Sequence, residues 1–242
     1  MTFEFATIEP TRKYLAFKRA VDVIVAIIGF ALVALPMLVI VVAVLFSGTS
    51  VLFRQTRIGE GGRRFTMYKF RTMSTDADPY ATKPVKTARH VTRVGRILRA
   101  SGLDELPQLW NVLRGDMSLV GPRPEMPFIV NDYDRVRRLR LQAQPGLTGL
   151  WQISTMRLQP IHDGIEYDLF YLANRSLAFD LWILYRTPLL LLFRRHVRMD
   201  QRLIDRWSQP ATAPEPRVVL DISDPTAPLI ELDLATERVQ SP

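Results

Sequence analysis

The sequence predicts a mainly helical α+β protein with a re-entrant membrane hairpin near its amino terminus and a small β-hairpin after it. Two observations predict this class. The 24 residues from Val23 to Phe46 contain no charge, which is enough for a helix that enters a membrane. Two stretches rich in β-branched and aromatic residues flank the glycine-rich turn at 59–62, and most later segments show helical patterns.

Composition narrows the class of protein. The 242 residues are 48% hydrophobic and 23% charged, which excludes global disorder. The absence of cysteine excludes disulfides, thiolate zinc sites and a cysteine nucleophile, and the three histidines lack metal-ligand spacing. The net charge of +8 suits a phosphate-bearing partner: a nucleic acid, a nucleotide or an anionic lipid.

The chain divides by charge and composition into three segments. We expect an amino-terminal segment with the membrane helix over 1–50, a basic domain over 51–207 and an acidic tail over 208–242. The tail has six acidic and two basic residues and begins with a Pro/Ala linker at 208–216. Its two apolar-polar alternating runs predict a hairpin or a docked strand pair, with a flexible tail as the alternative.

The uncharged run has two features that argue against a simple spanning helix. Pro36 lies near its middle, where it removes a backbone donor and predicts a bend. Basic residues also flank both ends, and the positive-inside rule places such flanks on the cytoplasmic side. A re-entrant hairpin satisfies both flanks and is favoured over a spanning helix, which satisfies one.

Asp22 lies just inside the apolar boundary, where an isolated carboxylate is costly. One interpretation pairs it with Arg19 or Lys18, three and four residues back on the same helix face. The other makes it an acid near a helix amino terminus, stabilised by the macrodipole. The sequence leaves both open.

The remaining elements follow in order along the chain. The turn at 59–62 predicts a β-hairpin. The last helical segment is strongly apolar but contains Asp180 and Arg186, so we expect an amphipathic helix at the membrane interface, with Trp182 and Tyr185 as anchors. The expected helices cover 91–100, 106–113, 126–142, 165–172 and 177–193.

The densest cluster of charge runs from Arg93 to Glu125 and mixes five arginines with four acids. A site for a diphosphate with Mg²⁺ needs this mixture, because arginines fork onto phosphate oxygens and carboxylates hold the metal. The plainer interpretation makes Asp104 a helix N-cap and Glu105 a first-turn acid.

Ordered motifs in this part of the chain resemble a family. Over about residues 13–195 the sequence resembles the bacterial sugar transferases, the monotopic polyprenyl-phosphate phosphoglycosyl transferases. The motifs are KRAVD at 18–22, FRQTRIG at 53–59, YKFRTM at 68–73, LDELPQLWNVL at 103–113, GDMSLVGPRPE at 115–125 and PGLTGLWQ at 145–152.

The resemblance implies a reaction. A phosphosugar passes from a UDP-sugar to polyprenyl (undecaprenyl) phosphate and UMP is released, as the first membrane step of exopolysaccharide or other glycoconjugate synthesis. Asp104 is the implied nucleophile, which forms a covalent phosphosugar aspartate. Glu105 would join Asp104 in holding Mg²⁺. The resemblance places Arg99 and Arg123 at phosphate and nucleotide, with Pro124 and Glu125 in the uridine-side wall.

The resemblance also implies a location. The re-entrant hairpin, with Arg19, Asp22 and Pro36, would hold the catalytic domain on the cytoplasmic face of the bacterial inner membrane. Two departures are visible: Leu35 replaces a commonly polar residue before Pro36, and Arg157 follows Thr155-Met156 where the family usually has Gly-Arg.

A second class of function is open to this sequence, namely a membrane-anchored basic binding or scaffold protein of a polysaccharide assembly complex. A purely anion-binding surface does not explain the acids among the arginines. We expect no nucleic acid partner. A second copy of the chain or polysaccharide assembly proteins are the expected protein partners.

Overall fold

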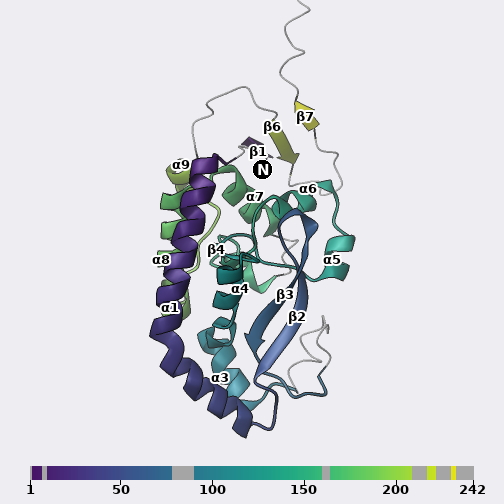
Figure 1. The fold of residues 1–242 in the computed structure, drawn as a ribbon. Helices are drawn as coiled ribbons and strands as arrows, with labels where there is room; N and C mark the ends of the chain where they lie inside the picture. Colours follow the sequence, from purple (N-terminus) through teal and green to yellow (C-terminus); the bar gives the residue numbers. More distant parts are fainter. Residues whose placement is uncertain are drawn as a thin grey trace, which may run out of the picture.

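The computed structural model describes residues 2–6, 10–77, 90–159, 164–208, 217–221 and 230–232. Most of them are helical, and the strands form three small sheets, which confirms the predicted mainly helical α+β class. A long helix, α1, runs along one side of the molecule, and a β-hairpin lies on the other side (Figure 1). Helix α4 (Gln108–Arg114) lies between them.

Helix α1 spans Arg12–Phe46, and the hydroxyl of Thr11 caps it by accepting a hydrogen bond from the backbone N–H of Tyr14 (3.2 Å). In the described part of the chain it is the helix long and apolar enough to cross a membrane. It continues through Pro36 as one helix and bends along its length (Figure 1). Large apolar side chains on it are bare, with Leu32 74% and Phe46 89% exposed, so its surface requires a non-aqueous cover.

The β-hairpin predicted around 59–62 is confirmed. Strands β2 (Leu52–Ile58) and β3 (Arg64–Phe70) pair in antiparallel register and are joined by the short 3₁₀ turn η1 (Glu60–Gly62). Gly61 and Gly62 have φ values of 64° and 77°, which only glycine adopts readily.

The predicted helices over 91–100 and 106–113 are present with shifted ends. Helix α3 (Arg93–Ser101) ends at Gly102, whose φ of 73° turns the chain into the 3₁₀ turn η2 (Leu103–Glu105). Helix α4 follows, and after it strand β4 (Ser118–Val120) pairs in parallel with β5 (Gly146–Thr148).

The prediction of one helix over 126–142 was wrong. The segment is divided into α5 (Pro127–Asn131), α6 (Arg135–Arg138) and the 3₁₀ turn η3 (Leu139–Gln142). Asp134 breaks the pattern, because it takes an extended conformation and its carboxylate accepts a hydrogen bond from the backbone N–H of Arg137 (2.8 Å). A short 3₁₀ turn, η4 (Thr155–Leu158), follows β5.

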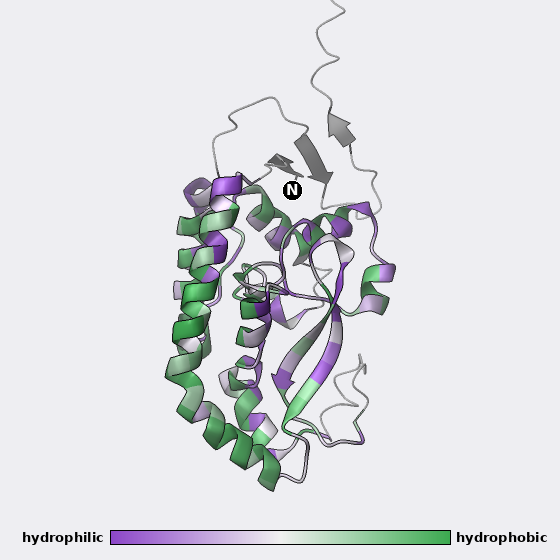
Figure 2. Ribbon diagram, viewed as in Figure 1, coloured by the Kyte–Doolittle hydropathy of each residue, from purple (hydrophilic) through white to green (hydrophobic). Residues whose placement is uncertain are grey.

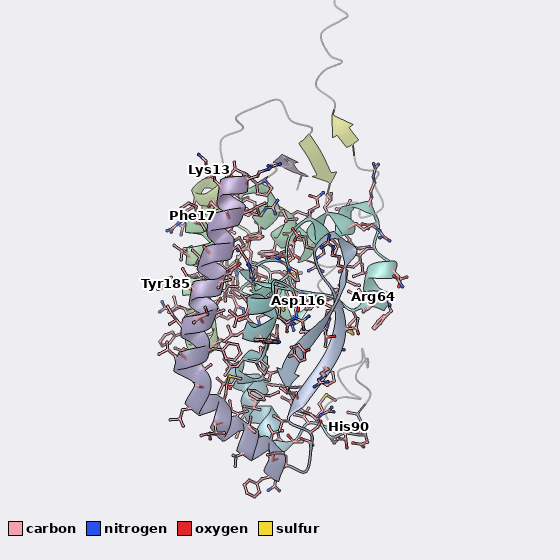
Figure 3. The ribbon with its side chains drawn as sticks, in the orientation of Figure 1. Lys13, Phe17, Arg64, His90, Asp116 and Tyr185 are labelled. Carbon is pink, nitrogen blue, oxygen red and sulfur yellow. The ribbon has the colours of Figure 1, made fainter. Side chains whose placement is uncertain are left out.

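The carboxyl-terminal helices form the largest part of the core. Helices α7 (Ile165–Ala173) and α8 (Leu177–Phe193) confirm the predicted positions, and α9 (Gln201–Trp207) was not predicted. Trp207 stacks on buried Phe179 with ring centroids 4.7 Å apart. Helix α8 lies beside α1, and both are predominantly apolar (Figure 2). Tyr185 and Phe17 point outward from these two helices (Figure 3).

The tail contributes to a sheet with the amino terminus. Strands β6 (Arg217–Asp221) and β7 (Ile230–Leu232) form the expected antiparallel pair, and β1 (Thr2–Ala6) adds a third strand beside β6. The linker at 209–216 and the segments 222–229 and 233–242 lie outside the described residues.

Candidate functional site

A cavity of about 730 Å³ lies between the β-hairpin, the α3–η2 turn and α8. Four residues singled out from the sequence line it together: Arg99, Asp104, Glu105 and Arg123. Its polar lining is strongly cationic, with six basic side chains against two carboxylates. The basic residues are Arg57, Lys69, Arg71, Arg99, Arg123 and Arg157.

Glu105 is held by two of these cations. Its Oε1 lies 2.6 Å from Nζ of Lys69 and 3.5 Å from Nη2 of Arg123. Burial alone would raise the pKa of the carboxyl, but Lys69 and Arg123 outweigh burial and lower the pKa to about 2. Glu105 is therefore ionised throughout the physiological range and serves as an anchor for two cations.

Asp104 differs from its neighbour. It is 9% exposed, lines the cavity and forms no ion pair with any residue that the structure describes. Burial raises the pKa of its carboxyl, and the Lys69 charge opposes that rise. Arg99 also acts on it electrostatically, and that guanidinium is fixed by donating from Nε to the hydroxyl of Thr72 (2.8 Å). Asp104 thus offers an uncommitted carboxylate to a ligand.

The capping interpretation of Asp104 was wrong, whereas Glu105 does lie in the first turn of a short helix, the 3₁₀ turn η2. Helix α4 begins at Gln108 with Pro107 at its N-cap, so Asp104 does not cap it and Glu105 is not in its first turn. Both acids lie in η2 and line the cavity. The left-handed backbone conformation of Gly102 turns the chain from α3 into η2.

The turn at 121–125 positions Arg123. The carbonyl oxygens of four consecutive residues accept hydrogen bonds from three parts of the protein, namely β2, η3 and β5, which fixes this backbone. The donors are Gly146 N to Pro122 (2.8 Å), Arg140 Nη2 to Arg123 (2.9 Å), Arg57 Nη1 to Pro124 (3.2 Å) and Ile58 N to Glu125 (2.9 Å). Within the described part of the chain, Pro124 and Glu125 stand behind the cavity wall rather than in its lining.

Asp116, one of the acids in the charged stretch, has a local structural role. Its Oδ2 accepts a hydrogen bond from Nδ2 of Asn111 (3.1 Å), and Asn111 also donates to the carbonyl of Thr66 (2.7 Å) on β3. Asp116 lies near the centre of the molecule, whereas Arg64 lies at the outer side of the hairpin (Figure 3). The Asn111 side chain, held by Asp116, therefore ties α4 to the β-hairpin.

A buried ion pair supports the turn at 121–125 and was missed by sequence reasoning. Nη2 of Arg140 lies 2.7 Å from Oδ2 of Asp168 on α7, and each side chain is 2% exposed. Nη1 of Arg140 donates to the hydroxyl of Tyr133 (2.6 Å). Arg140 lies in the basic run assigned to one helix, so its burial had no local signal.

Polar residues of the long apolar helix α1 connect it to the rest of the molecule. Arg19 donates to the carbonyls of Val112 (2.6 Å) and Leu113 (2.8 Å), near the carboxyl end of α4. Oδ1 of Asp22 accepts from the backbone N–H of Leu119 in β4 (3.1 Å).

Asp22 forms no ion pair with either expected cation among the described residues, although the Lys18 charge still acts on its carboxylate. Lys18 forms its ion pair with Asp180 of α8 (2.8 Å) instead, and Arg19 is engaged with α4. The helix begins ten residues before Asp22, at Arg12, which is beyond the reach of the helix-terminal charge.

The donor set was tested for Mg²⁺. In the described part of the chain no three acidic or histidine side chains come together as a metal site. Mg²⁺ commonly binds one or two carboxylates together with substrate phosphates and water. Asp104 fits this role, and Glu105 adjoins it but is already bound by Lys69 and Arg123. A site here would depend on phosphates of a ligand for its remaining oxygens.

A family model described as bacterial sugar transferase matches residues 13–194 of the chain. The chain belongs to this family. It is 40% identical over 187 residues to the exopolysaccharide production protein ExoY of Sinorhizobium fredii, covering 70% of this chain and 83% of that protein. It is 45% identical over 181 residues to a Caulobacter vibrioides UDP-glucose:undecaprenyl-phosphate glucose-1-phosphate transferase, covering 70% and 67%.

A further relative is longer than this chain, and the match covers less than half of it. The chain is 36% identical over 192 residues to an Aeromonas hydrophila UDP-N-acetylgalactosamine-undecaprenyl-phosphate N-acetylgalactosaminephosphotransferase, covering 76% of this chain and 45% of that protein. The region matched by the family model, residues 13–194, contains the described residues that line the cavity.

Proposed function

We propose that this chain transfers a sugar-1-phosphate from a UDP-sugar to polyprenyl (undecaprenyl) phosphate and releases UMP, as a first membrane step of exopolysaccharide or other glycoconjugate synthesis. The observation that carries the proposal is the contrast inside the cavity. Asp104 is uncommitted, while adjacent Glu105 is bound by Lys69 and Arg123. The names of the Caulobacter and Aeromonas relatives support the same reaction class.

Asp104 is the proposed nucleophile. An oxygen of its carboxylate attacks the phosphorus that carries the sugar, and the bond from that phosphorus to the UMP oxygen breaks. A phosphate oxygen of the polyprenyl phosphate then attacks the same phosphorus, which releases the Asp104 carboxylate and forms the polyprenyl diphosphate sugar. Lys69, Arg99 and Arg123 are positioned to stabilise the negative charge of the phosphates.

Mg²⁺ is part of the proposal. Asp104, with Glu105 beside it, would hold the ion, and a bound Mg²⁺ would supply positive charge against the diphosphate of the donor. Glu105 would hold Lys69 and Arg123 in place around the same phosphates.

The proposed membrane arrangement follows from α1 and α8. Helix α1 is bent, apolar and mostly bare, and basic residues flank both of its ends. We propose that it enters the cytoplasmic leaflet and returns, and that α8 lies at the interface, so that the cavity meets the lipid phosphate on the cytoplasmic face of the bacterial inner membrane.

Release of UMP tests the reaction. Purified protein in nanodiscs, with Mg²⁺ and undecaprenyl phosphate, is mixed with each of a panel of UDP-sugars. We expect lipid-dependent UMP from one or a few donors, abolished by EDTA. UMP without lipid-linked product, or no UMP from folded protein with any donor, would contradict the proposed reaction, and undiminished turnover in EDTA would contradict the metal.

A further inference from the structure

The cavity has two unlike walls. The basic residues and the two acids come from the β-hairpin, α3, η2, the turn at 121–125 and η4. Helix α8 supplies a wall that is almost entirely apolar, formed by Leu184, Pro188, Leu190 and Leu191 with Thr187. We name these five residues the α8 wall. A UDP-sugar carries no long aliphatic group, whereas the polyprenyl acceptor does, so the acceptor is the better match for this wall.

The α8 wall continues to the outside of the molecule. Leu191 lines the cavity and is also 41% exposed, which places it at the rim. The next two residues, Leu192 and Phe193, are 74% and 62% exposed. Figure 2 shows this apolar character along α8 and along the adjacent α1. Exposed apolar side chains are therefore present from the cavity rim at Leu191 to the carboxyl end of α8 at Phe193.

The rim at Leu191 lies close to the turn that carries Asp104. A Cβ atom built on Gly102, two residues before Asp104, would lie 3.6 Å from Cδ1 of Leu191. The carboxyl end of α8 thus packs against the backbone turn that presents the nucleophile. A ligand phosphate at Asp104 can have its apolar substituent on Leu191 without crossing the cationic wall.

We infer that the polyisoprenoid chain of the lipid acceptor leaves the cavity over Pro188 and Leu191 and runs along α8 to the membrane. This inference rests on the proposed function. The cavity volume is that of a site for one small ligand, so a nucleotide sugar and a long isoprenoid chain do not fit inside together. The α8 wall supplies the exit, and the acceptor phosphate remains at Asp104.

Two adjacent leucines provide a matched test. Leu191→Gln places an amide at the rim, whereas Leu192→Gln makes the same change on the next residue, which does not line the cavity. We expect Leu191→Gln to raise KM for undecaprenyl phosphate about tenfold, because one leucine contact is worth roughly one decade of affinity. Leu192→Gln should change it less than about twofold. Lipid-free exchange of labelled UMP into the UDP-sugar should slow less than about twofold in either variant.

Two results would overturn the inference. One is an equal acceptor KM in the two variants. The other is an exchange reaction that slows in Leu191→Gln as much as the full transfer does, because that would place Leu191 in the donor site.

Photo-crosslinking separates this inference from the proposed chemistry. A diazirine-bearing polyprenyl phosphate is irradiated with wild-type protein and with Asp104→Asn in nanodiscs. We expect label on the tryptic peptide Thr187–Arg194 in both proteins, competed by undecaprenyl phosphate. Label there without turnover would retain the binding path and reject the reaction. Competed label confined to α1 or α3, with normal turnover, would reject the path and retain the reaction.

Discussion

Two clusters of opposite charges lie on either side of the turn at 121–125, and they are built differently. In the cavity cluster, Glu105 binds two cations, while Asp104 forms no ion pair with any cation among the described residues. In the interior cluster, Arg140 lies against Asp168, donates to Tyr133 and is withdrawn from water. The comparison shows that residue type does not distinguish a ligand site from a structural pair. The ligand site is distinguished by its access to the cavity and by a carboxylate that no described cation binds.

Replacing an aspartate by asparagine should therefore affect activity in the cavity cluster and stability in the interior cluster. Asp104→Asn is expected to lower turnover at least about 10³-fold, because the amide cannot act as the nucleophile. The free energy of unfolding, measured in urea, should stay within about 1 kcal/mol of wild type, because a partly desolvated charge without an ion pair is removed. UMP release and denaturation measured on one preparation check both. Full activity would reject Asp104 as nucleophile.

Asp168→Asn should act on stability. Removing one partner leaves the Arg140 charge buried, and breaking such a pair typically destabilises a protein by about 3–5 kcal/mol. The double change Arg140→Met with Asp168→Leu should recover part of this loss, because no unpaired charge remains. Urea unfolding in detergent measures both. A single variant as stable as wild type would show that the interior pair does not support the fold.

The sequence was a good guide to local structure. The glycine turn at 59–62, the helices over 165–172 and 177–193 and the long apolar helix are each specified by their own residues. Strand β4 pairs with β5, and β1 pairs with β6, so each pairing joins residues far apart in the chain. No local sequence pattern predicts such pairings. The break at Asp134 was missed because the helical pattern around it continues on both sides.

The sequence predicted which residues gather at the candidate site better than it predicted the role of each one. Arg99, Asp104, Glu105 and Arg123 come together in the cavity as the motifs suggested. Lys69 lies in one of the quoted motifs but received no role, because its contact with Glu105 spans 36 residues. Pro124 and Glu125 hold the backbone behind the wall, and such a hydrogen-bonding role has no signature in a single sequence.

Lys69 offers a smaller perturbation of the cavity cluster. Lys69→Met removes the closest cation of Glu105 and should raise the pKa of that carboxyl, because burial would then be opposed by Arg123 without Lys69. Loss of one charge-assisted contact to the phosphates should lower turnover about 10- to 100-fold, less than Asp104→Asn does. Steady-state UMP release measures it. An effect as large as that of Asp104→Asn would give Lys69 a direct part in bond making.

The smallest expected effect is a shift of the pH profile, which separates the two neighbouring acids. Burial raises the pKa of Asp104 above its ordinary value of 3.8, and the charge of Glu105 adds to that rise, whereas Glu105 itself titrates at about 2. The nucleophile must be ionised, so the rate of the donor half-reaction should fall as the pH drops through the pKa of Asp104, while Glu105 is still charged.

Glu105→Gln removes the neighbouring negative charge and should move this acid limb of the pH profile to lower pH. Arg99→Gln removes a positive charge and should move it to higher pH. UMP exchange without lipid, followed across the acid range in all three proteins, measures the direction of each shift. A limb that stays at one pH in both variants would assign the titration to a group other than Asp104.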